Sequence, residues 1–283
     1  MEPTELVYLT LDHYLDKLDT VTVSETGFFK TDHEKEHYET IFMYSFRKYR
    51  AAVYHSNLIN KFLIEYVENA QTNPLREIKD DETFTTNICY TADHFAFELS
   101  AFLESLKSSV DFLATNCSFH IPRIQCKSIS TLLKRAKDEN ERDPIFDVIR
   151  QNQKWLDELR IYRHHFVHFR FNSTSCGYKR QVIKGAQKIF IYPVIIPQSP
   201  PPYVPDTRRY RAEEKSPFLN YRGGFTQIKN NNDGKKNIFM FYPPLGYITI
   251  EDFIEVYLNS YQKFFTELMQ TLSDLDFQKS NFS

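Results

Sequence analysis

The sequence predicts a mainly α-helical protein, an antiparallel bundle of four to six helices with an irregular insertion and a small β-hairpin before the last helix. Three observations indicate this class. Apolar residues recur at helical spacing over long stretches of the 283-residue chain. The composition supplies 25 Phe and 18 Tyr for helix packing but only 7 Gly. Nine of the 13 prolines fall in residues 172–248, where the helical pattern stops.

We expect one domain with three segments. Residues 1–171 form the helical bundle, residues 172–248 form a basic, Pro-rich insertion that contains the hairpin, and residues 249–283 form a C-terminal helix that packs back on the bundle. Within the first segment, a short helix is expected over residues 5–18 and a long one over residues 32–70.

The clearest amphipathic pattern starts at Ile88 and ends at Leu113, with apolar residues three or four positions apart. It predicts a second long helix, separated from the first by a short polar stretch around Pro74. Two long helices joined in this way are typical of an antiparallel pair.

A short helix follows over residues 127–137. Asp143 and Pro144 then form an N-cap and a first-turn proline, which predict a helix that extends to Phe171. Its apolar positions, Leu159 and Phe166 among them, lie on or near one face.

Two segments of the insertion have the β-branched and aromatic composition of strands: residues 188–192, continued by 194–196, and residues 237–242. The final helix starts at Thr249, whose hydroxyl is a suitable N-cap, and acidic residues follow in its first turn.

The formal net charge is −2, which excludes a uniformly basic nucleic-acid-binding protein. The charge is unevenly distributed, however. Residues 170–236 contain 13 basic and four acidic side chains, so this stretch carries +9. A basic segment of this kind suits contacts with nucleic-acid phosphates.

The four cysteines form no Cys-x-x-Cys pair and are too few for a disulfide scaffold, so we expect reduced thiols. The acidic N-terminus lacks the pattern of a signal peptide. No apolar run approaches the roughly 18 residues of a membrane span. We therefore expect a cytoplasmic protein with no membrane partner.

The densest chemical cluster is residues 163–168, Arg-His-His-Phe-Val-His, near the C-terminal end of a predicted helix. His164 and His168 are four residues apart and share a helical face, with Arg163 beside it. Three interpretations are open. The cluster can be a solvated helix end whose cations complement the helix dipole. His164 and His168 can be half of a zinc site, although no third ligand is evident. The cluster can also perform acid–base chemistry on a phosphate held by the guanidinium.

The order Arg163-His164 followed by His168 resembles the signature of the HEPN superfamily, in which Arg is followed after four to six residues by His. The position late in a helical bundle is also similar. The resemblance covers about residues 33–171, and the last helix is a further candidate for inclusion. It implies a metal-independent endoribonuclease that acts as a homodimer, often as a toxin or phage-defence effector with an antitoxin protein as partner. Other members of the superfamily are non-catalytic RNA- or protein-binding modules, which is the alternative function.

Carried over to this sequence, the resemblance implies that His168 is the catalytic histidine and Arg163 the phosphate-binding arginine. His164 takes the polar position after the arginine and orients the site. His165 has no place in the pattern and is expected at the surface or behind the site. RNA is the expected partner, and neither a metal ion nor a cofactor is expected.

Basic and aromatic residues after the cluster are candidates for RNA binding, because rings can stack on bases while cations hold phosphates. These are Arg170, Lys179, Arg180, Arg208, Arg209, Tyr210 and Arg211. The alternative for residues 208–211 is an exposed polar loop with no binding role.

Overall fold

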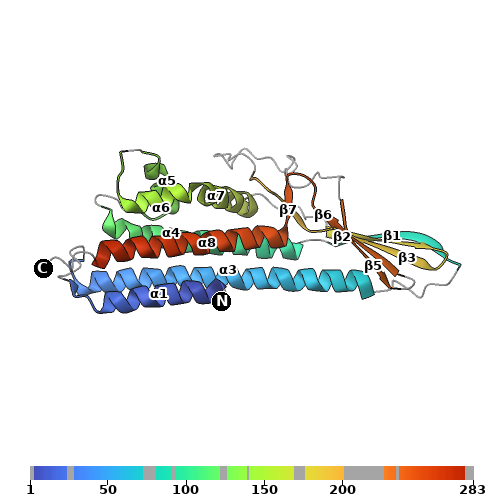
Figure 1. Ribbon diagram of the computed structural model, residues 1–283, viewed down its shortest axis with the longest axis horizontal. Coiled ribbons are helices and arrows are strands. Elements are labelled where there is room, and N and C mark those ends of the chain that lie inside the picture. The colour runs from blue at the N-terminus through green and yellow to red at the C-terminus, as the bar shows by residue number, and fades with distance from the viewer. Residues whose placement is uncertain are drawn as a thin grey trace. The chain divides into compact units, whose positions relative to one another are not determined.

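The computed structural model describes residues 3–23, 29–72, 81–90, 93–121, 126–138, 140–168, 176–200, 226–233 and 236–277. Over these residues the chain is mainly helical, as predicted (Figure 1). The helices are α1 (Pro3–Asp19), α3 (Asp32–Thr72), α4 (Asp93–His120), α5 (Ile129–Ala136), α6 (Pro144–Gln151), α7 (Gln153–His168) and α8 (Ile250–Phe277). The strands are β1 (Thr83–Tyr90), β2 (Cys176–Ile183), β3 (Ala186–Ile191), β4 (Ile195–Pro197), β5 (Thr226–Asp233), β6 (Lys236–Tyr242) and β7 (Tyr247–Thr249).

The chain divides into two compact units, each assembled from separate stretches. Unit 1 comprises residues 1–54, 101–163 and 255–283, and unit 2 comprises residues 55–100 and 164–254. The unit boundaries fall inside long helices. The three segments expected from the sequence stay a prediction about domain organisation.

Unit 1 is a helical bundle held by aromatic packing and buried hydroxyls. The hydroxyls of Tyr14 on α1 and Tyr38 on α3 are 2.7 Å apart, and the Tyr38 hydroxyl lies 2.9 Å from His120 Nε2 on α4. Further along α3, Ser45 Oγ lies 2.9 Å from Ser109 Oγ. Tyr38 precedes Ser45 along α3, whereas its partner His120 follows Ser109 along α4. The two helices therefore run in opposite directions, and the predicted antiparallel pair is confirmed.

The helix predicted from Pro144 to Phe171 is two helices within the described residues. Asp143 caps α6 as expected, because its Oδ1 accepts a hydrogen bond of 2.9 Å from the Ile145 amide. Asn152 then ends α6. Its side chain donates to the Val148 carbonyl and accepts from Trp155 Nε1, bonds that compete with a continuous helix.

Unit 2 contains a five-stranded sheet with the strand order β1-β2-β3-β6-β5. The two strands predicted in the insertion, β3 and β6, are neighbours but pair in parallel rather than as a hairpin. The hairpins are β2–β3 and β5–β6. Lys184 and Gly185 connect β2 to β3 with φ of 46° and 74°, as a two-residue type I′ turn requires.

Strand β1 has no counterpart in the sequence prediction. The apolar spacing predicts a helix that begins at Ile88, but Ile88 lies in β1, and its backbone pairs with Tyr178 of β2 in an antiparallel register. The helix α4 begins at Asp93 instead. Strand β1 therefore comes from the connection between the two long helices. The five-stranded sheet is larger than the small hairpin that the sequence predicts.

One face of the sheet is buried in unit 2. It carries Tyr178, Arg180, Val182, Ile189 and Ile191. The hydroxyl of Tyr66 on α3 donates to the carbonyls of Gly177 and Tyr192, which anchors that helix to the strands. No helix of the described chain has the length and apolar composition needed to cross a bilayer.

Candidate functional site

The motif of residues 163–168 lies in the last turns of α7. The helix continues to His168, so His164 and His168 occupy positions four residues apart on one helical face, as predicted. Leu159, Tyr162 and Phe166 are buried and form the core-facing stripe of the same helix. The side chain of His168 lies outside the described part of the chain.

Arg163 is anchored by a carboxylate that the sequence did not single out. Its Nε donates a hydrogen bond to Oε2 of Glu104 on α4, and both residues belong to unit 1. The side chains retain 26% and 44% of their exposure, so the pair is accessible to solvent. The guanidinium is therefore oriented at a surface position, with part of its charge offset by Glu104.

The acidity of Glu104 reflects this pairing. Burial alone would raise the pKa of its carboxyl, but the hydrogen bond and charge of Arg163 outweigh that effect, with smaller contributions from Lys107 and Lys48. The pKa of Glu104 is consequently lowered, and the carboxylate stays ionised through the neutral range.

His165 is buried, with 4% of its surface exposed. Of the two places expected for this residue, its burial excludes the surface and leaves a position behind the site, because the core-facing side of α7 includes position 165. The rings of His164 and His165 meet edge to face, with centroids 5.9 Å apart. The contact therefore joins a buried imidazole to a partly exposed one, that of His164.

The predicted RNA-binding residues differ in exposure, and several lie outside the described residues. Lys179 is partly exposed on β2, on the face of the sheet opposite the buried one. Arg180 is buried, with 2% exposure, and Nη2 donates to the Ala70 carbonyl in the last turn of α3. It cannot contact RNA from that position, so we remove it from the candidate surface. The other predicted positions lie outside the described residues; they are Arg170, Arg208, Arg209, Tyr210 and Arg211.

A zinc site at His164 and His168 needs at least a third ligand. Among the described residues, no group of three or more His, Cys, Asp or Glu side chains is placed to hold a metal ion. Cys117 and Cys126 are buried free thiols, as the sequence suggested.

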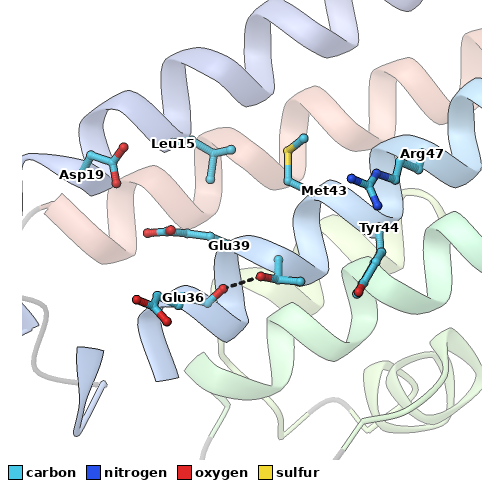
Figure 2. A pocket seen from close by; sticks show the side chains of 8 residues that line it. Leu15, Asp19, Glu36, Glu39, Met43, Tyr44 and Arg47 are labelled. Atoms are coloured by element: carbon cyan, nitrogen blue, oxygen red, sulfur yellow. Dashed lines mark hydrogen bonds between the residues drawn. The ribbon is translucent and has the colours of Figure 1, made fainter. Parts of the chain in front are cut away.

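A hollow of about 530 Å³ opens between α1 and α3 in unit 1 (Figure 2). Asp19, Glu36 and Glu39 line it together with a single cation, Arg47. Burial, and the charge of Asp19, raise the pKa of Glu39. An acidic hollow repels phosphate, and it includes none of the predicted site residues. We therefore do not assign the phosphate chemistry to it.

Unit 2 contains an imidazole–carboxylate pair that no sequence motif indicates. His55 Nδ1 on α3 lies 2.7 Å from Glu98 Oε2 on α4, and both side chains are about three-quarters buried. The two residues are 43 positions apart in the chain, so only the antiparallel pairing of the helices brings them together.

Comparison of the chain with protein-family models, with curated proteins and with solved structures finds no match in any of the three. The resemblance to the HEPN superfamily thus depends on the motif of residues 163–168 and on its place in a helical bundle.

Proposed function

We propose that this protein is a metal-independent endoribonuclease of HEPN type that uses Arg163, His164 and His168. The observation that carries the proposal is the ion pair between Arg163 and Glu104 of α4. Arg163 lies on α7, the helix that also contains His164 and His168. An oriented, solvent-accessible guanidinium one residue before a histidine is a suitable partner for a phosphodiester.

In the proposed reaction, His168 removes the proton from a ribose 2′-hydroxyl. The 2′-oxygen attacks the adjacent phosphorus, and the bond from phosphorus to the 5′-oxygen breaks. A second histidine, either His164 or one from a partner subunit of a homodimer, protonates the leaving 5′-oxygen. The products are a 2′,3′-cyclic phosphate and a 5′-hydroxyl, so atoms and protons balance. Arg163 stabilises the charge that develops on the phosphorus oxygens.

The nature of the substrate follows from the nucleophile. DNA lacks the 2′-hydroxyl, so the proposed reaction is confined to RNA. The test is end-group analysis of the products with purified protein in EDTA. Cyclic phosphate ends from RNA, and no cleavage of an RNA whose 2′-hydroxyls are all methylated, support the mechanism. Cleavage of the methylated strand would contradict it.

A second function, a non-catalytic RNA- or protein-binding module, is favoured by the same ion pair. Glu104 offsets part of the charge that Arg163 would offer to a phosphate. A carboxylate partner of this kind is also what an arginine with a purely structural role requires. This alternative predicts RNA binding without cleavage, and no effect of His168→Ala on the RNA affinity. A toxin or defence role with an antitoxin partner is part of the ribonuclease proposal only.

A further inference from the structure

The outer face of the sheet in unit 2 carries a row of stacked aromatic rings. Phe190 on β3 and Phe239 on β6 are register partners, with centroids 4.9 Å apart and planes 12° apart. Tyr192 and Phe241 lie 5.1 Å apart at 8°, and Phe190 and Phe241 lie 6.2 Å apart at 16°. All four rings are partly exposed. The sheet therefore presents a set of nearly parallel rings to its surroundings.

Cations and amides flank the rings on the same face. Directly paired residues of neighbouring strands share a face, so one row across the sheet consists of Asn87, Lys179, Phe190 and Phe239. The adjacent row consists of Thr85, Gln181, Lys188 and Asn237. Lys179 Nζ lies 5.7 Å from the centroid of Phe190, so it caps the stack of rings at one end.

The charged side chains described in these two rows have one sign. Across the two rows, the side chains that the structure describes include two lysines and no carboxylate. Rings, amides and cations without acidic residues are complementary to a single nucleic-acid strand: bases stack on or against rings, amides bond base edges, and lysines hold phosphates. A duplex hides its bases and would not use the rings.

We propose that this outer face, formed by Phe190, Tyr192, Phe239, Phe241, Lys179 and Lys188, binds single-stranded RNA. Self-association through the same face is disfavoured, because a symmetric interface would bring the lysines of both copies together. An oligosaccharide would use the rings and amides but has no charge for the lysines. The choice of RNA over DNA rests on the proposed function.

The experiment measures the anisotropy of a fluorescent single-stranded RNA in EDTA, with His168→Ala as the background so that no cleavage interferes. Phe241→Leu keeps apolar volume but removes a ring, and we expect it to weaken binding about tenfold. Lys179→Gln with Lys188→Gln leaves the ring stack intact. It should weaken binding by a similar factor and lower the slope of log affinity against log salt by roughly 1.4, or 0.7 for each lost phosphate contact.

The matched control is Lys61→Gln with Lys263→Gln, two lysines on helices with 67% and 70% exposure, and it should leave affinity and slope unchanged. Circular dichroism of each variant verifies that the sheet has folded. Affinities that stay within twofold of the background for both the ring and the lysine variants would overturn the proposal. Oligosaccharide binding, or a dimer, that the same variants abolish while RNA binding persists would also overturn it.

The failures of the two proposals are distinguishable. If the natural sequence binds RNA through this face but does not cleave it, the proposed binding surface is supported and the proposed ribonuclease activity is contradicted. Cleavage that depends on His168, with an affinity insensitive to the face, contradicts the surface alone. Absence of any binding to single-stranded RNA overturns the surface.

Discussion

Arg163 on α7 donates a hydrogen bond from Nε to the carboxylate of Glu104 on α4. The two residues are 59 positions apart in the chain, and the ion pair fixes the first residue of the histidine motif to a neighbouring helix. Glu104 therefore both orients Arg163 and competes with any phosphate for its charge. That double role makes position 104 an informative place for a substitution.

Glu104→Gln keeps an acceptor for Arg163 Nε but removes the competing charge. We expect the RNA affinity to rise up to about fivefold, and the free energy of unfolding to fall by less than about 1 kcal/mol, because the pair is solvent-exposed. Anisotropy and urea unfolding measure the two effects. The control is Glu65→Gln on α3, because Glu65 forms an exposed ion pair with Lys61. Weaker RNA binding by Glu104→Gln than by the control would show that Arg163 does not meet phosphate.

The stability of unit 1 should depend on pH through His120. Burial lowers the pKa of this imidazole to about 4 from an ordinary value of 6.5. The unfolded chain therefore binds a proton that the folded protein does not, and stability is lost as the pH falls from about 6.5 to 4. The upper limit of the loss is roughly 3 kcal/mol, and residual solvation of the ring reduces it.

Urea unfolding at a series of pH values checks this prediction. His120→Gln preserves a partner for the Tyr38 hydroxyl but does not titrate, so its stability should change less between neutral and acidic pH. His33→Gln removes a histidine with 91% exposure and should behave like the natural sequence. Identical acid sensitivity of His120→Gln and the natural sequence would exclude His120 as the source.

The buried hydroxyls of Ser45, Ser109 and Tyr261 connect α3, α4 and α8. The Tyr261 hydroxyl lies 2.6 Å from Ser109 Oγ. Tyr261→Phe removes this bond while Ser109 Oγ keeps its bond to the Ser45 carbonyl, so we expect a loss of about 1–2 kcal/mol in unfolding free energy. Tyr8→Phe, at a ring with 46% exposure, should stay within about 0.5 kcal/mol. Equal effects of the two substitutions would contradict a role for the network.

Arg180 should matter for stability and not for RNA. Lys179, which precedes it in the chain and belongs to the candidate surface, lies on the opposite face of the sheet. Arg180→Met keeps most of the volume and should change unfolding by less than about 1 kcal/mol, whereas Arg180→Ala leaves a cavity and should cost about 2–4 kcal/mol. Neither should alter the RNA affinity. A loss of affinity in folded Arg180→Met would restore this residue to the binding surface.

Periodicity predicted most of the helices because each buries a stripe that is visible in a local window. The N-cap at Asp143 was found for the same local reason. The sheet was largely missed because its pairings are long-range. Ile88 continues the apolar spacing of α4, yet its backbone pairs with Tyr178 about ninety residues later. The parallel pairing of β3 with β6 likewise cannot be recognised from the residues of either segment alone.

The candidate site shows the same division. The spacing of His164 and His168 on one helical face follows from the sequence alone. The partner of Arg163 and the burial of His165 depend on how α7 packs, which a motif does not specify. The same holds for Arg180: alternation along β2 separates it from Lys179, but which face is buried depends on α3.

The most direct measurement is the rate of RNA cleavage in EDTA by the natural sequence and by His168→Ala and Arg163→Ala, with His33→Ala as the matched control. The proposed mechanism predicts a loss of at least about a hundredfold for His168→Ala and for Arg163→Ala, with RNA affinity reduced far less for His168→Ala, and no change for the control. Equal rates in all four proteins, or no cleavage by the natural sequence, would contradict it.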